Sequence, residues 1–277
     1  MKISQELLVQ ELSINQKIQE KYHVTFSCEK DFSKMKYGGI CNFEKQIEFY
    51  GGTLYLMNAK SDEMIAPISN QSKDLLFCLI NGSESQIRDI QYPVINLVPK
   101  AKDMKIVYHQ IFAIIYGIFQ KYSNWQDQMN QAVENETLQK LLEISYPIFN
   151  RSIYAADDKP EYLAAAGPCL DYRGSGSQIP LEIFNYLKND LNNRPPNPEQ
   201  KPFIYPRGIL CADSLCLDIF IKQDYFCRLI LIDEIGKSAF LESDYYLLEI
   251  LGRSFTDLIN RGGLYSKKIK SIKSHKT

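Results

Sequence analysis

The stretch of this sequence that comes closest to a ligand site is a glycine- and serine-rich segment that begins with an arginine, Arg173-Gly-Ser-Gly-Ser177. It lies just before an expected helix at Leu181–Leu191, so its backbone, hydroxyls and guanidinium could hold a phosphate or carboxylate. Tyrosines and a second arginine nearby would suit a planar or anionic metabolite. The predicted ligand-binding residues are Tyr172, Arg173, Ser175, Ser177, Tyr205 and Arg207. The segment matches neither the Walker pattern nor the dinucleotide fingerprint, and a plain connecting loop is the alternative.

Residue types for hydrolytic catalysis are sparse. The three histidines, His23, His109 and His275, have no serine or cysteine motif beside them that would form a nucleophile and base pair. Adjacent acids occur at Asp157-Asp158 and Asp233-Glu234, both in expected turns, where carboxylates cap and solvate the chain. The sequence therefore predicts no catalytic residue, and we expect that the chain is not an enzyme.

The seven cysteines include no CxxC pair, and their odd number argues against a disulfide framework. Cys78 and Cys227 lie in apolar, strand-like runs, where a cysteine usually serves as a small core residue. No metal site and no cofactor is expected. One alternative stays open, a thiol-dependent enzyme that uses Cys169, Cys211 or Cys216.

The chain is longer than a typical single domain of about 100–200 residues, so two domains are expected. The predicted fold class is α+β. The predicted parts are an N-terminal α/β domain at 1–102, a helical linker at 103–137, a GAF/PAS-like sensor domain at 138–265 and a basic tail at 266–277.

The first part contains the order strand, helix, strand. The apolar run Leu75–Ile80 ends at Asn81-Gly82, a helix fits Ser83–Ile90, and a second run follows at Val94–Val98. This order indicates a βαβ unit in a small mixed or parallel sheet.

The third part has the patterns of an antiparallel sheet with flanking helices. Strands are predicted at Ser152–Ala156 and Tyr162–Ala166, separated by a turn. A second antiparallel pair is predicted at Leu215–Ile221 and Phe226–Asp233, and apolar spacing predicts a long closing helix at Glu242–Arg261. Sheets of this kind commonly carry a ligand on one face.

Three segments resemble the sensor region of bacterial transcription regulators of the PucR or CdaR type. They are Leu141–Gly167, Cys227–Arg261 and Phe49–Ala59, the last with the sequence FYGGTLYLMNA. The resemblance implies a GAF- or PAS-like domain, and both arrangements fit the pattern. Members of this family usually continue into a C-terminal helix-turn-helix domain. Here only a short lysine-rich segment follows the closing helix, so direct DNA binding by this chain is not expected.

The charge distribution agrees with that expectation. The net charge is −1, and the last twelve residues hold five lysines and no acid, so the rest of the chain is acidic and would repel phosphates.

The start of the chain is not a signal peptide, and the most apolar run, Ile106–Phe119, is too short to span a bilayer. A cytoplasmic location is therefore expected, without a membrane partner.

These patterns favour a ligand-sensing regulatory protein that binds a small metabolite in its C-terminal domain. A homodimer through the helices at Ile106–Leu142 and the closing helix is expected. A scaffold that only dimerises and recruits partners, without a ligand, is the main alternative.

Overall fold

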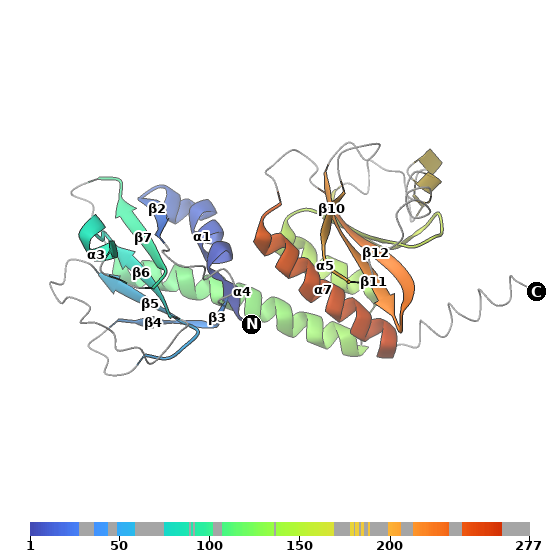
Figure 1. Ribbon diagram of the computed structural model, residues 1–277, viewed down its shortest axis with the longest axis horizontal. Coiled ribbons are helices and arrows are strands. Elements are labelled where there is room, and N and C mark those ends of the chain that lie inside the picture. Colours follow the sequence, from blue (N-terminus) through green and yellow to red (C-terminus); the bar gives the residue numbers. More distant parts are fainter. Residues whose placement is uncertain are drawn as a thin grey trace, which may run out of the picture. The chain divides into compact units, whose positions relative to one another are not determined.

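The computed structural model describes residues 1–27, 36–43, 49–58, 75–88, 92–101, 107–135, 137–168, 199–205, 213–232 and 240–261, and the short pieces 90, 178–179, 181–182, 184–185 and 188. The chain combines helices with two five-stranded sheets, so the predicted mixture of α and β structure is confirmed. It divides into two compact units, Met1–Asn124 and Trp125–Thr277 (Figure 1). The division falls inside the stretch for which the sequence predicts a linker, and the finer domain bounds stay a prediction.

The N-terminal unit begins with a short strand and two consecutive helices. Ser4, in β1 (Ile3–Ser4), caps α1 (Gln5–Ile14), because its hydroxyl accepts a 3.3 Å bond from the Leu7 N–H. Asn15 ends α1 and caps α2 (Gln16–Gln19) in the same way. Serine and asparagine suit these positions since their side-chain oxygens satisfy N–H groups that the helix leaves free.

The sheet of the N-terminal unit is mixed, with the strand order β2-β7-β6-β5-β4. Its strands are β2 (Tyr22–Ser27), β4 (Gly39–Asn42), β5 (Thr53–Asn58), β6 (Leu75–Ile80) and β7 (Val94–Pro99). β4 to β7 are parallel, whereas β2 runs antiparallel to β7; β1 pairs separately with β3 (Lys36–Tyr37). The helix α3 (Glu84–Arg88) connects β6 to β7, which confirms the predicted order of strand, helix and strand.

The long helix α4 (Tyr108–Asn135) belongs to the N-terminal unit through its first seventeen residues. The Tyr108 hydroxyl donates a hydrogen bond to the Leu56 carbonyl of β5. The Glu11 carboxylate of α1 accepts from the Lys121 ammonium at 2.7 Å and from the Tyr122 hydroxyl at 2.5 Å. These contacts hold α4 against both β5 and α1.

The sheet of the C-terminal unit is antiparallel throughout, with the order β10-β11-β12-β8-β9. Its strands are β8 (Ser152–Ala156), β9 (Tyr162–Ala166), β10 (Phe203–Tyr205), β11 (Ser214–Ile221) and β12 (Asp224–Ile232). β11 and β12 form the expected hairpin, and its two turn residues, Lys222 and Gln223, both have positive φ values, as a type I′ turn requires.

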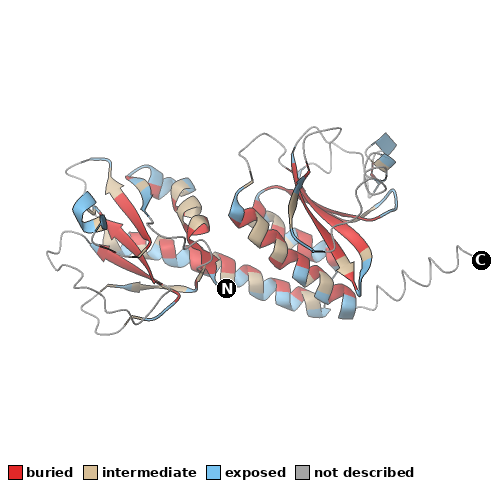
Figure 2. Cartoon of the chain, in the orientation of Figure 1, coloured by how far each residue is buried: buried red, intermediate tan, exposed pale blue. Residues whose placement is uncertain are grey.

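Two helices cover one face of this sheet. α5 (Leu138–Phe149) packs on β8 and β9, α7 (Glu242–Arg261) packs on β11, and the two helices contact each other (Figure 1). The Gln139 side-chain amide fixes α5 to β9, since it both donates to and accepts from the Ala165 backbone, at 2.7 and 3.0 Å. The bounds of α7 are those predicted, and its inner side is buried (Figure 2). Within the described ranges, no helix has both the length and the apolar character needed to cross a bilayer.

Candidate ligand-binding site

The C-terminal sheet has a second face, which points away from α5 and α7. Leu217 and Ile219 of β11 face α7, because a Cβ added at Gly252 would lie 2.4 Å from Leu217 Cδ2 and 3.2 Å from Ile219 Cδ1. Side chains alternate along a strand, so their neighbours in β11 point the other way. We call this other side the distal face. Its buried side chains include Tyr154, Tyr205, Ser214, Cys216, Asp218, Arg228, Ile230 and Ile232.

The distal face contains a buried ion pair between two strands. The Asp218 carboxylate accepts two hydrogen bonds from the Arg228 guanidinium, at 2.7 and 3.3 Å. The two side chains are only 1% and 6% exposed. Burial alone would lower the pKa of Arg228, but the hydrogen bonds and negative charge of Asp218 outweigh that effect and raise the pKa above its ordinary value. Arg228 is therefore a permanent cation inside the protein.

An aromatic ring covers the same guanidinium. The Arg228 Cζ atom lies 5.1 Å from the centre of the Phe203 ring, within the range of a cation–π contact. Phe203 belongs to β10, whereas Arg228 belongs to β12, and Phe203 stands opposite Cys216 of the intervening β11. The charged pair thus has a flat apolar neighbour, which is an arrangement that suits planar groups.

Tyrosines form a second part of the distal face. The rings of Tyr154 and Tyr162 lie with their centres 4.9 Å apart. Tyr205 is 3% exposed and joins the same apolar cluster, together with Ile179 and the half-buried Phe184. Tyrosine rings combine a flat apolar surface with a hydroxyl that can donate or accept a hydrogen bond.

Ser214 is the most unusual residue of the distal face. Its side chain is fully buried, and its Oγ has no hydrogen-bond partner in the part of the chain that the structure describes. It stands opposite Tyr205 in the pairing of β10 and β11. A buried polar group without a partner costs about 1–3 kcal/mol, so this hydroxyl favours an additional polar group beside it.

The predicted site residues have different outcomes. Tyr205 lies on the distal face, beside Ser214. Tyr172, Arg173, Ser175, Ser177 and Arg207 lie outside the described residues, so their assignment to a ligand site stays a prediction.

Asp218 and Arg228 were not predicted, although the sequence contains a signal for them. Each is the only charged residue within an apolar strand interior, in SLCLDIFI and YFCRLILI. One isolated charge in a strand normally marks the solvent face, and only the antiparallel register brings these two together.

Three of the described cysteines are buried core residues, and the fourth, Cys41, is half-buried. Cys78 and Cys227 are fully buried, as predicted, and burial raises the pKa of the Cys78 thiol to about 12. Cys216 is 2% exposed on the distal face, whereas Cys169 and Cys211 lie outside the described residues.

Comparisons with known proteins give distant structural matches. No family model and no curated protein matches the sequence. One similar structure is the GAF domain of the phosphoenolpyruvate-protein phosphotransferase from Acinetobacter, at 13% identity and a TM-score of 0.34, over 52% of this chain and 95% of that one. Another is the free methionine-R-sulfoxide reductase of Neisseria meningitidis with its substrate, at 14% identity and a TM-score of 0.35, over 58% and 95%.

The second of these structures corrects one expectation. The scarcity of histidines and the turn positions of the paired acids led to the expectation that the chain is not an enzyme. Since an enzyme is among the similar structures, that expectation is wrong as an inference from the sequence. A fold does not fix a function, and at this similarity neither structure assigns one to the chain.

Proposed function

We propose that the chain is a ligand-sensing regulatory protein and that the distal face binds a small, planar metabolite with polar or anionic groups. The observation that supports this most is the buried, unpartnered Ser214 hydroxyl on a face that also holds Tyr205 and the Asp218–Arg228 pair. Ser214 and Asp218 lie four residues apart on the same side of β11, about 13 Å along the strand. That span fits a molecule of metabolite size.

The strand β11 also offers a route from the ligand to the rest of the unit. Ser214, Cys216 and Asp218 alternate with Leu215, Leu217 and Ile219, and Leu217 and Ile219 contact α7 at Gly252. A ligand that shifts β11 therefore changes the packing of α7, and a ligand biases an equilibrium only through such a difference in contacts. In our proposal, α7 carries the signal, and the chain is the sensor part of a transcription regulator of the PucR or CdaR type.

The first test is native mass spectrometry of the purified protein, with denaturing spectra of the same sample. A co-purified molecule identifies the chemical class directly. A thermal-shift screen of nucleobases, nucleotides and aromatic carboxylates follows. A ligand at one hundred times its Kd stabilises the protein by about 2.7 kcal/mol, which such a screen detects.

Matched variants locate the binding site. We expect Ser214→Ala and Tyr205→Phe to weaken the binding of a screened ligand about tenfold, since each removes one hydroxyl from the distal face. Ser254→Ala on α7 and Tyr146→Phe on α5 remove the same groups from the helices and should leave the affinity unchanged. Equal affinities in all four variants would show that the ligand binds elsewhere.

A further inference from the structure

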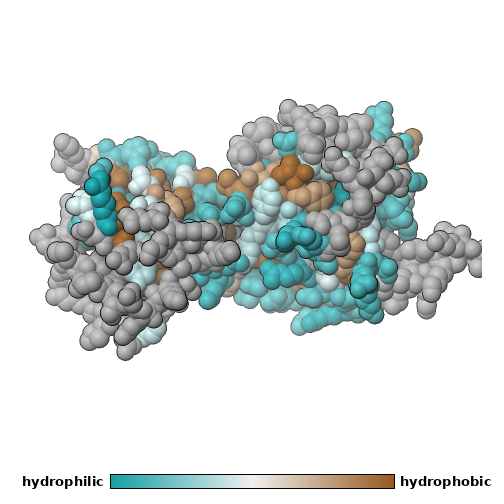
Figure 3. Space-filling model, viewed as in Figure 1, coloured by the Kyte–Doolittle hydropathy of each residue, from teal (hydrophilic) through white to brown (hydrophobic). Residues whose placement is uncertain are grey.

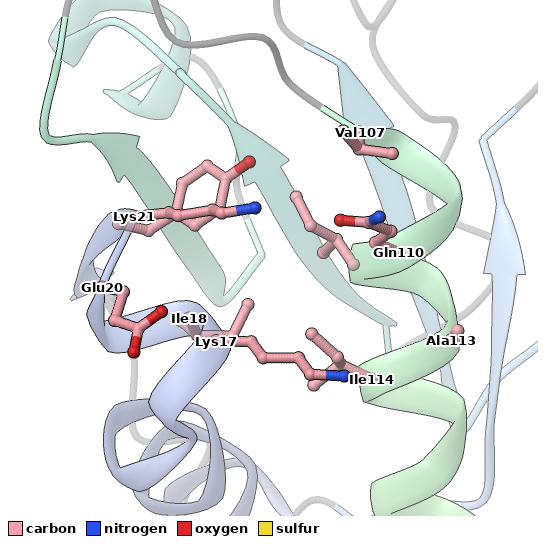
Figure 4. Close-up of a pocket in the computed structure, with 10 residues that line it drawn as sticks. Lys17, Ile18, Glu20, Lys21, Val107, Gln110, Ala113 and Ile114 are labelled. Carbon is pink, nitrogen blue, oxygen red and sulfur yellow. The ribbon is translucent and has the colours of Figure 1, made fainter.

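A groove in the N-terminal unit lies between α2, the beginning of β2 and the first turns of α4 (Figure 4). Its volume is about 520 Å³, which falls within the roughly 300–1,000 Å³ of small-molecule sites. The residues that matter for its chemistry are Lys17, Lys21 and Gln110 on the polar side, and Ile18, Ile111 and Ile114 on the apolar side. The groove belongs to a different unit from the distal face.

Two ammonium groups point into this groove. Lys17 and Lys21 are four positions apart, and both side chains extend into the space between α2 and α4 in Figure 4. Neither forms an ion pair or a side-chain hydrogen bond within the described ranges. Like charges at this spacing repel each other, so an anion between them would be favourable.

Among the residues that the structure describes, one acid lines the groove, and its carboxylate is directed elsewhere. Glu20 points away from the space between α2 and α4, and its Oε1 accepts a 2.9 Å hydrogen bond from Gln16 Nε2. The local charge inside the groove therefore remains positive.

The opposite wall adds further groups that favour an anion. α4 begins at Tyr108 and has no acid in its first turn, and the positive end of its dipole lies beside this groove. From the same wall, the Gln110 amide points into the groove. Tyr22 also lines it, and burial raises the pKa of this phenol, so the hydroxyl keeps its proton at neutral pH.

The floor of the groove is apolar. Ile18 and Ile111 lie beneath it and are only 1% and 2% exposed, so the half-buried Ile114 is the isoleucine of the three that a ligand can contact. Figure 3 shows that hydrophilic residues make up much of the described surface on the face in view, with only small apolar patches between them. A charged rim above an apolar floor selects molecules that carry both kinds of group.

We propose that this groove binds a small organic anion with an apolar body, whose carboxylate or phosphate lies between Lys17 and Lys21 and whose apolar part packs on Ile114 and on the methylene groups of the two lysines. This site is separate from the ligand site of the C-terminal sheet, and neither depends on the other. A carboxylic acid and a phosphate ester share the required chemistry, and the test below distinguishes them.

The test is isothermal titration calorimetry of the full chain with octanoate, octyl phosphate and octanol, below the concentration at which each aggregates. The variants are Lys17→Gln/Lys21→Gln and, as a control, Lys140→Gln/Lys159→Gln, which removes two exposed lysines from the C-terminal unit. We expect at least one anion to bind the unchanged protein at least tenfold more tightly than octanol does. The groove variant should lose that difference, and the control should retain it.

The preference between octanoate and octyl phosphate identifies the head group. Methyl NMR signals of Ile18 and Ile111 should shift on binding and thereby locate the ligand. The proposal is overturned if neither anion binds, if octanol binds as tightly as both anions, or if the groove variant and the control have the same affinity.

Discussion

Arg228 of β12 stands directly opposite Asp218 of β11, and its Nε donates a 2.7 Å hydrogen bond to Asp218 Oδ1. Both charges are buried away from water, so the opposite charge of its partner is the main source of stabilisation for each of them. Replacing one member of such a pair leaves an uncompensated charge, whereas replacing both with apolar residues is often tolerated.

A double-mutant cycle tests this dependence. Asp218→Leu and Arg228→Met should each lower the free energy of unfolding by about 3–5 kcal/mol. The double variant should be far more stable than the sum of the two losses implies. Urea unfolding followed by tryptophan fluorescence measures each value. Losses that add within about 0.5 kcal/mol would mean that the two side chains act independently.

The single tryptophan supplies that optical signal and a second prediction. Trp125 is 2% exposed, and its indole Nε1 donates a 3.1 Å hydrogen bond to Ser145 Oγ, which connects α4 to α5 within the C-terminal unit. Ser145→Ala leaves this buried N–H without a partner and should cost about 1–3 kcal/mol. Ser254→Ala removes a half-buried hydroxyl whose one hydrogen bond, among the described residues, is to the Ile250 carbonyl of its own helix, so it should cost much less in the same urea experiment.

Two glycines should respond in opposite ways to alanine. Gly167 has a φ of 121°, and a Cβ there would lie 2.7 Å from the Ser152 Cα atom, so Gly167→Ala should lower the free energy of unfolding by more than about 2 kcal/mol. Gly117 lies inside α4, where a Cβ would meet nothing within 4 Å. Gly117→Ala should therefore stabilise the helix by about 0.5–1 kcal/mol. Thermal unfolding by circular dichroism checks both, and a stable Gly167→Ala would contradict the strain argument.

The buried thiol of Cys78 predicts a pH dependence. Burial raises its pKa from 9.0 to about 12, so above pH 9 the unfolded chain loses a proton that the folded chain keeps. Stability that is present below pH 9 is then lost as the pH rises, by about 1 kcal/mol between pH 9 and 10. Cys78→Val keeps the apolar packing and removes the titrating group, so it should show a weaker decline in urea unfolding followed by circular dichroism. Parallel declines in the two proteins would exclude this cause.

Local sequence patterns predict many of the elements in this fold. The apolar spacing from Leu247 to Ile259 gives the bounds of α7, and the alternation around Lys222 gives the β11–β12 hairpin. The sequence does not predict that β8 pairs with β12, or that β2 pairs with β7, because each pairing joins segments far apart in the chain.

The same limit applies to the sites. Tyr205 could be selected as an aromatic residue near an arginine, but Ser214 has no distinctive local pattern. Its importance comes from complete burial without a hydrogen-bond partner among the described residues, which depends on the whole sheet. The groove at Lys17 and Lys21 likewise needs α4 beside α2, and these helices are separated by almost ninety residues.

The hidden pair on the distal face also has an evolutionary consequence. A lineage that changes either codon 218 or codon 228 alone passes through a protein with one unmatched interior charge. Such an intermediate is selected against, so the two positions should covary across related sequences, retained together or replaced together. Neutral drift at one of them is therefore conditional on the residue at the other, and this epistasis would persist whether or not the surrounding face binds a ligand.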